Sequence, residues 1–303
     1  MTLARRLHFV FKVDCEPLQD RSPACGGPES WAVSERVVRG IRDVFEARGL
    51  RRALIFNLTP EAAAAHAPIW RAWRHEGVQF GIQPNVPGFR FPMYAKDLGQ
   101  YEESAQREII TGASEDFEAA LGFRADTYSA CCGSKSPVTL RLLYEAGYRQ
   151  TFSPVPGRHF PDRPDRCTVG VFPYPHWGNA RHHLLPGALP LCVVPHTGDT
   201  ASGDGARPAD LRAEAPVGEA TRALFRRIID HHVELSGLIQ APVRTIVGNT
   251  HNTGRVNLEN VALVADYARE AATRAGLEFA SVTMREIRAA LMEAMPLSDI
   301  AAA

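Results

Sequence analysis

The chain has 303 residues, of which 45% are hydrophobic and 22% charged, the composition of an ordinary globular protein. Its 34 basic residues balance 34 acidic ones, so no net charge attracts it to nucleic acid or to an anionic membrane surface. The first apolar run is broken by Lys12 and Asp14, and no stretch approaches the ~20 apolar residues of a membrane helix, so we expect a cytoplasmic protein without a membrane span.

The first half of the chain alternates apolar strands with amphipathic helices. The first helix places Val38, Ile41 and Phe45 on one stripe, and either Ser30 or Ser34 can cap its start. We expect strands at 8–14, 53–58, 78–84, 125–132 and 150–155, and further helices at 61–77, 99–121 and 138–147.

The second half keeps this alternation after a long irregular stretch. Residues 156–207 are rich in Pro, Gly and His, and we expect a decorated loop region there with short strands at 168–174 and 191–196. A helix with Leu224, Phe225 and Ile228 on one stripe follows it. We then expect strands at 245–249 and 277–282, and helices at 258–274 and 284–294.

Strands that alternate with helices predict a parallel sheet covered by those helices. Seven or eight strands suit a barrel better than an open sheet. The alternative is a doubly wound sheet, but no G-x-G-x-x-G or P-loop follows a strand, which removes the main support for nucleotide binding. We therefore expect residues 1–303 to form a single α/β domain, a distorted (β/α) barrel with 156–207 as its decorated loop region.

Polar residues follow nearly every predicted strand, and in such barrels these strand ends meet at one face. They are Asp14 to Glu16, Gln83 to Asn85, Ser129 to Gly133, His196 to Asp199 and Asn249 to Asn252. Alternation along the first strand places Lys12, Asp14 and Glu16 on one side. The two carboxylates can bind a divalent cation, or one of them can act as a base. The alternative is a pair of loop carboxylates facing water, but the strongly apolar strand before them favours a functional site.

Four motifs in order resemble those of the NodB-homology deacetylases, carbohydrate esterase family 4. They are FKVDCEP, GVQFGIQPN, the stretch 117–148 with its Phe-Arg core, and TIVGNTHN followed by LEFASVTMREI. The resemblance covers about residues 7–294 and implies a distorted barrel of seven to eight strands that removes N-acyl groups from amino sugars. In that family an Asp and two His hold a metal, usually zinc. By resemblance Asp14 is the base, Glu16 the acidic metal ligand and His251 the acid.

The chain departs from this pattern at Gln83, which stands where the second motif of the family has a histidine. A glutamine oxygen is a poor zinc ligand beside an imidazole. Three hypotheses stay open. Glu16, His196 and His251 together bind a divalent metal such as zinc; or Lys12 supplies the positive charge without a metal; or hydrolysis has been lost.

Further residues are candidates for substrate binding. Gln83, Asn85, Ser129 and Cys131 follow predicted strands, whereas Tyr174 and Trp177 belong to the loop region and can stack on a sugar ring.

These observations predict a hydrolase that removes an acetyl or formyl group from an amino-sugar-type substrate, in glycan or secondary-metabolite biosynthesis. The catalytic candidates are Asp14, His251 and Lys12. The alternative is a non-catalytic barrel that binds a glycan or a small amide. In either case we expect a small-molecule or glycan partner and no nucleic acid. The sequence does not determine the oligomeric state.

Overall fold

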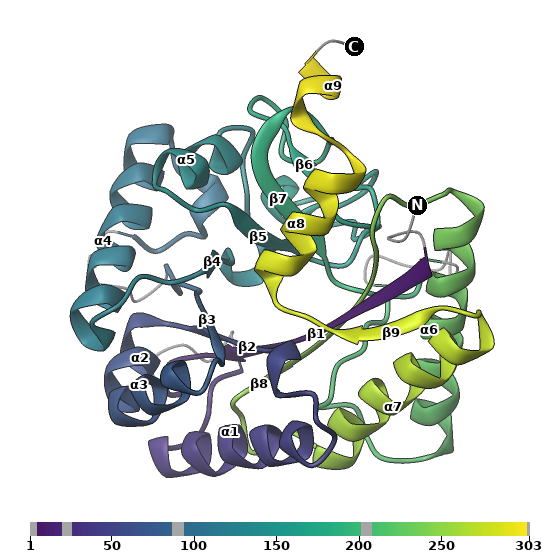
Figure 1. Ribbon diagram of the computed structural model, residues 1–303. Coiled ribbons are helices and arrows are strands. Elements are labelled where there is room, and N and C mark those ends of the chain that lie inside the picture. Colours follow the sequence, from purple (N-terminus) through teal and green to yellow (C-terminus); the bar gives the residue numbers. More distant parts are fainter. Residues whose placement is uncertain (1–4, 20–25, 87–93, 201–207, 302–303) are drawn as a thin grey trace.

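A computed structural model of the protein describes residues 5–19, 26–86, 94–200 and 208–301 (Figure 1). In these ranges a sheet of nine strands has the order β6-β7-β5-β4-β3-β2-β1-β8, and β9 also pairs with β1. All of its pairings are parallel except that of β6 with β7. The strands are β1 (Arg6–Cys15), β2 (Leu54–Leu58), β3 (Gln79–Ile82), β4 (Thr127–Tyr128), β5 (Gln150–Ser153), β6 (His176–Gly178), β7 (Leu189–Pro195), β8 (Arg244–His251) and β9 (Glu278–Ser281).

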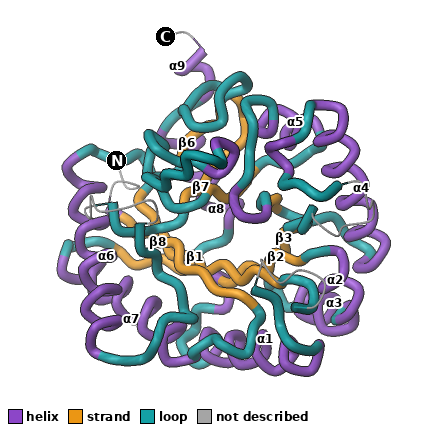
Figure 2. The backbone as a smooth tube through the Cα atoms, turned by 180° about the vertical axis from the view of Figure 1, so that it is seen from behind, coloured by secondary structure: helices purple, strands orange, loops and turns teal. Residues whose placement is uncertain are grey.

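Helices surround this sheet on the outside (Figure 2). Ser30 accepts a hydrogen bond from the backbone of Val33 and so caps the first of them, and Gly122 ends the fourth in the left-handed conformation, with φ of 77°. The helices are α1 (Trp31–Glu46), α2 (Pro60–Ala65), α3 (Ala67–His75), α4 (Glu103–Leu121), α5 (Thr139–Glu145), α6 (Glu219–Leu238), α7 (Leu258–Arg274), α8 (Met284–Ala294) and α9 (Leu297–Ala301). Among the described helices, none has the length and apolar character needed to cross a membrane.

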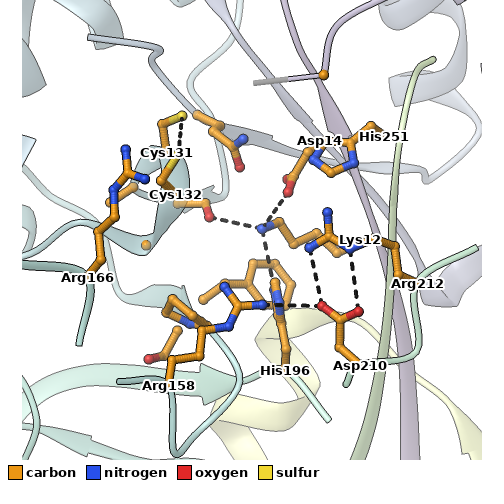
Figure 3. A pocket seen from close by; sticks show the side chains of 18 of the residues that line it. Lys12, Asp14, Cys131, Cys132, Arg158, Arg166, His196, Asp210, Arg212 and His251 are labelled. Carbon is orange, nitrogen blue, oxygen red and sulfur yellow. Dashed lines mark hydrogen bonds and ion pairs between the residues drawn. The ribbon is translucent and has the colours of Figure 1, made fainter. Parts of the chain in front are cut away.

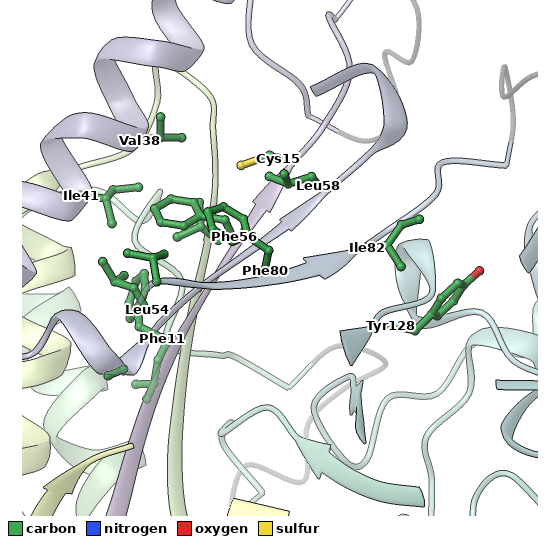
Figure 4. Close-up of a cluster of buried hydrophobic side chains, with 14 of the residues drawn as sticks. Phe11, Cys15, Val38, Ile41, Leu54, Phe56, Leu58, Phe80, Ile82 and Tyr128 are labelled. Atoms are coloured by element: carbon green, nitrogen blue, oxygen red, sulfur yellow. The ribbon is translucent and has the colours of Figure 1, made fainter. Parts of the chain in front are cut away.

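Strand β1 pairs with three other strands and is buried along nearly its whole length. It pairs with β8 along one edge and with β9 and then β2 along the other. Its odd-numbered residues, among them Phe9 and Phe11, pack outward against the helices in the larger apolar cluster (Figure 4). Val10 points the other way, into a smaller cluster inside the curl of the sheet. Lys12 and Asp14 follow Val10 at even positions, so alternation turns them toward the interior.

The curled sheet is linked across its open side by residues that follow β7. The backbone of Thr197 donates to Val247 in β8 at 3.3 Å, and the segment around Arg212 forms a parallel bridge to Asn249. At the other end, α8 places Met284 and Ile287 in the inner cluster and covers it. Side chains therefore fill the inside of the curled sheet at the end that α8 covers, and the inside is accessible at the carboxyl ends of the strands. This confirms the predicted distorted barrel.

Most predicted elements agree with the structure, and three do not. The helix predicted at 61–77 is two helices, because the chain leaves the helical conformation at His66, two residues before Pro68. The strand predicted at 125–132 keeps two residues, because the chain then enters a short turn in which Cys132 has φ of 54°. Residues 168–174 form no strand; β6 lies just after them and pairs antiparallel with β7.

Candidate active site

A pocket of about 590 Å³ opens at the carboxyl ends of the strands (Figure 3). Its volume is that of a small-molecule site. Residues far apart in the sequence meet there because parallel strands present their carboxyl ends on one side of the sheet. The lining includes Lys12, Asp14, Glu16, Gln83, Ser129, Cys131, Cys132, Arg158, Arg166, His196, Asp210, Arg212, Glu214, His251 and Arg255.

The ammonium group of Lys12 lies at the centre of this pocket. It is 2.9 Å from Oδ2 of Asp14, 3.1 Å from Oγ of Ser129 and 3.3 Å from Nε2 of His196. Lys12 is 3% exposed, so these contacts replace water around its charge. An ammonium has three hydrogens to donate, and three acceptors surround it. Asp14 therefore anchors the charge, while Ser129 and His196 complete its shell.

Asp14 and His251 are neighbours because the register of β1 and β8 pairs them directly. Nδ1 of His251 lies 2.6 Å from Oε1 of Glu214, which also accepts the backbone N–H of His251 at 2.9 Å. Burial opposes the charge of His251, but the hydrogen bond to Glu214 and the charge of that carboxylate outweigh it and raise the pKa of His251. This dyad fixes the orientation of the ring, keeps it protonated to higher pH and leaves Nε2 for the pocket.

Glu16 and Gln83 form a second buried pair. Nε2 of Gln83 donates to Oε1 of Glu16 at 2.7 Å, and Asn252 holds the backbone of Glu16 through its N–H and its carbonyl. Burial is the main cause that raises the pKa of Glu16 to about 8, and the nearby charge of Asp14 adds to it. At neutral pH the Glu16 carboxyl is therefore mostly uncharged.

His196 lies next to Lys12 and is held in its neutral form. Burial, followed by the positive charges of Lys12 and of Arg158, keeps the pKa of His196 well below its usual value. Because an ammonium can only donate, Nε2 of His196 accepts from Lys12. The other ring nitrogen lies 3.1 Å from the side-chain amide of Asn249. His196 thus serves the lysine as a neutral acceptor.

The predicted metal ligands Glu16, His196 and His251 line the same pocket, but they do not fit a divalent cation. Within the described residues no three His, Cys, Asp or Glu side chains are arranged to hold a metal ion. Nε2 of His196 faces the ammonium of Lys12, and Nδ1 of His251 is taken by Glu214. The positive charge of Lys12 would repel a cation beside His196. The prediction of a metal site did not include this repulsion.

The predicted substrate-binding residues divide into two groups. Gln83, Ser129 and Cys131 line the pocket, and Sγ of Cys131 lies 3.7 Å from that of the adjacent Cys132. Asn85 is also buried, but it is not among the described residues that line the pocket.

Tyr174 and Trp177 are fully buried, contrary to the prediction that they stack on a sugar ring. The hydroxyl of Tyr174 donates to the backbone of His232 at 2.6 Å, and the indole of Trp177 to that of Met295 at 2.8 Å. Both aromatic rings belong to the packed interior.

Sequence reasoning missed a group of charged residues that the structure brings to the pocket. Asp210, Arg212 and Glu214 come from the segment that runs beside β8, and Arg158 follows β5. A signal was present, because Leu211 and Ala213 between them are fully buried, which gives the segment the alternation of a strand. The run is too short to stand out among the loops around it.

Comparisons with known proteins connect this geometry to a fold. No family model matches the chain, and no curated protein matches it in sequence. Among solved structures it resembles PuuE allantoinase, with 15% identity and a TM-score of 0.59 over 97% of this chain and 92% of the other. A probable polysaccharide deacetylase from Pseudomonas aeruginosa PAO1 matches with 14% identity and a TM-score of 0.55, over 97% and 93%.

A structure described as a polysaccharide deacetylase from Mycobacterium smegmatis matches with 13% identity and a TM-score of 0.53, over 96% and 91%. At these identities the likeness shows the fold. The chain shares the NodB-like deacetylase fold with these proteins, as the order of the sequence motifs predicted.

Proposed function

We propose that this protein is a hydrolase that removes an acetyl or formyl group from a small N-acyl amino sugar, with Lys12 providing the positive charge at the reaction centre. The observation that carries the proposal is the arrangement of Asp14, Lys12 and the His251–Glu214 dyad around one pocket. This arrangement supplies a candidate base, a positive charge and a candidate acid, groups that can each accelerate amide hydrolysis. The proposal places the reaction in glycan or secondary-metabolite biosynthesis.

Asp14 is the candidate base. Its Oδ2 pairs with Lys12, while Oδ1 has no hydrogen-bond partner among the described residues and is buried. A buried carboxylate oxygen without a protein partner is suited to orient a water molecule and to accept its proton. The oxygen of that water then forms a bond to the acyl carbon.

Ser129 and Lys12 are the candidate groups for the negative charge that develops on the acyl oxygen. Ser129 accepts a hydrogen bond from Lys12, so its own hydroxyl hydrogen is available to donate. The ammonium polarises that hydroxyl, and because Lys12 is buried its charge acts more strongly than in solvent. Together they stabilise the tetrahedral intermediate.

His251 is the candidate acid for the departing amine. Glu214 holds Nδ1 and raises the pKa of the ring, so that Nε2 carries a proton to donate. When the carbon–nitrogen bond breaks, this proton goes to the amine nitrogen and the acid product leaves with the water oxygen. Before the next turnover, the proton that Asp14 took from water returns to solvent, and His251 takes up a proton from solvent.

A small non-sugar amide is a second candidate substrate. The fold likeness to an allantoinase and the small-molecule size of the pocket favour it. A panel that contains N-acetyl and N-formyl amino sugars together with cyclic and linear ureides separates the two candidates by the product released.

The test measures release of acetate, formate or amine by purified protein before and after treatment with a chelator. We expect turnover that survives the chelator, and we expect Asp14→Asn and His251→Gln to abolish it in protein that is still folded, although Asp14→Asn lowers stability by breaking the buried pair with Lys12. Asp266→Asn is the matched control, since Asp266 forms an ion pair with Arg48 on the surface. Turnover that disappears with the chelator contradicts the role of Lys12. No release from any substrate favours the non-catalytic barrel.

A further inference from the structure

The turn that follows β4 carries two adjacent cysteines on the wall of the pocket. Sγ of Cys131 lies 3.7 Å from Sγ of Cys132, and both residues line the pocket beside Ser129. Figure 3 shows the contact between the two thiols, on the same side of the pocket as Arg166. Cys131 is 5% exposed, and Cys132 is partly exposed. Two thiols in contact at a pocket wall can react together, which a single cysteine cannot.

The turn keeps Cys132 in a backbone conformation that side chains rarely adopt. Cys132 has φ of 54°, and Gly133 follows it with φ of 73°, so two successive residues are left-handed. A Cβ at position 133 would lie 1.9 Å from Cγ of Pro154, so the turn packs tightly there. A left-handed cysteine is unfavourable and persists only where the surrounding structure imposes it, often at functional sites. Packing against Pro154 thus maintains this conformation at the second cysteine.

Arg166 and Glu16 are ionisable side chains near Cys132. Burial opposes the charge of Arg166, but the negative charge of a Cys132 thiolate raises the pKa of that arginine. Arg166 also donates to Asp97, so only part of its positive charge acts on Cys132. Glu16 is mostly uncharged at neutral pH, because burial raises its pKa to about 8. A guanidinium near a thiol favours the thiolate, which is the form that attacks disulfides.

We propose that Cys131 and Cys132 form a reversible disulfide by exchange with a small-molecule disulfide, and that this bond disables the pocket. The thiolate of Cys132, the more exposed of the two, attacks one sulfur of the small disulfide and releases one thiolate. Cys131 then gives its proton to solvent, and its sulfur displaces the second small thiolate from Cys132. The protein is oxidised by two electrons, and the small disulfide is reduced to two thiols, which take up protons from solvent.

Ring strain makes this bond reversible. Bonded cysteines usually have Cα atoms ~4.4–6.8 Å apart, whereas neighbouring residues across a trans peptide are only ~3.8 Å apart. The disulfide therefore closes a strained ring, and strained disulfides are the ones that are easily reduced and act in regulation. We expect a small dithiol to open it again.

The bond acts on the pocket through Ser129, two residues before Cys131. Oγ of Ser129 accepts a hydrogen bond from Nζ of Lys12 at 3.1 Å and is a candidate donor to the acyl oxygen. A disulfide requires sulfur atoms ~2.0 Å apart instead of 3.7 Å, and closing so small a ring involves the backbone of the turn. Because hydrogen bonds weaken beyond ~3.2 Å, a small shift of Ser129 removes its contact with Lys12. This effect rests on the function proposed above, whereas formation of the disulfide does not.

The test oxidises the purified protein with hydroxyethyl disulfide and then reduces it with dithiothreitol. Trypsin cleaves after Arg124 and Lys135, so both cysteines fall in one peptide, 125–135, which contains no other cysteine. After oxidation we expect this peptide to be lighter by two hydrogens in mass spectrometry. Turnover should fall at least about tenfold, the effect of one hydrogen bond lost from the transition state, and dithiothreitol should restore it.

The double variant Cys131→Ser, Cys132→Ser is decisive, and Cys167→Ser is its matched control. Cys167 is also partly exposed, but it is not among the described residues that line the pocket. We expect the turnover of the double variant not to respond to the oxidant, and that of Cys167→Ser to respond as the wild type does. Thermal unfolding of both variants identifies any general loss of structure.

Several outcomes would overturn the proposal. One is a peptide 125–135 that stays reduced, carries only a mixed disulfide or is linked to another part of the chain. Another is a disulfide within this peptide that leaves turnover unchanged, or a loss of turnover that the double variant also shows.

A crystal structure of the oxidised protein gives a measure that does not need activity. We expect Ser129 to lie out of hydrogen-bond reach of Lys12, and a Ser129 that stays within reach overturns the proposal. If the disulfide forms and Ser129 moves but the reduced protein releases no acyl group, the redox site stands and the hydrolase proposal fails.

Discussion

The buried ion pair of Lys12 and Asp14 allows a quantitative test. Their charged atoms are 2.9 Å apart, and their side chains are 4% and 12% exposed. With an effective dielectric constant of about 20, Coulomb's law gives an attraction of roughly 6 kcal/mol, part of which offsets the cost of burying both charges. Replacement of Lys12 by Met leaves Asp14 buried without compensation. We expect the free energy of unfolding to fall by about 3–5 kcal/mol.

A double-mutant cycle with Asp14→Asn isolates the interaction. Urea unfolding of the wild type, both single variants and the double variant gives the coupling energy, which we expect to be about 2–3 kcal/mol. The exposed helical pair Glu35–Arg39 is the control, and its coupling should stay near ~0.5 kcal/mol. Additive effects at Lys12 and Asp14, within ~0.5 kcal/mol, would refute the view that this pair organises the site.

Three further predictions follow from the electrostatics and packing of the site. Glu214→Gln removes the charge that raises the pKa of His251, so the fall of kcat with rising pH should move to lower pH in a pH–rate profile. An unmoved profile would contradict the assignment of His251 as the acid. The pKa of Glu16 is about 8 when folded. Between the ordinary carboxyl pKa of ~4.3 and pH ~8, the folded chain therefore keeps a proton on Glu16 that the unfolded chain has lost. Over this range the free energy of unfolding falls as the pH rises. Glu16→Gln should remove this fall. Its free energy of unfolding, relative to that of the wild type, should then rise by at most ~1.4 kcal/mol per pH unit in urea unfolding from about pH 5 to about pH 8. Trp177→Phe loses the hydrogen bond to Met295 and should lower stability by about 1–2 kcal/mol with no change in KM, whereas a sugar platform would raise KM.

Much of the fold could be predicted from local patterns. The helices at 258–274 and 284–294 agree with α7 and α8 residue for residue, because their apolar stripes and caps are sequence features. The split of the helix at His66 and the short β4 were missed, because Pro68 and the turn at Cys132 act against otherwise regular patterns. Strand β6 is three residues long and leaves no periodic signal.

The sequence also predicted which strand ends form the pocket. Asp14, Gln83, Ser129, His196 and His251 all line it, because alternation and strand polarity place such residues without knowledge of their partners. The burial of Tyr174 and Trp177 could not be predicted in this way, since an aromatic ring in a loop or in a strand as short as β6 packs inside or outside according to what the rest of the chain brings to it.

Sequence by itself therefore determined the alternating strands and helices, the barrel they build and the inward face that carries Lys12 and Asp14. Only the tertiary structure decided the partners of those side chains. The ammonium of Lys12 meets His196 across 184 residues, and Glu214 reaches His251 across 37. The physical reason is that periodicity is a property of neighbouring residues, whereas charge pairing and pKa depend on distances that exist only once the barrel has formed.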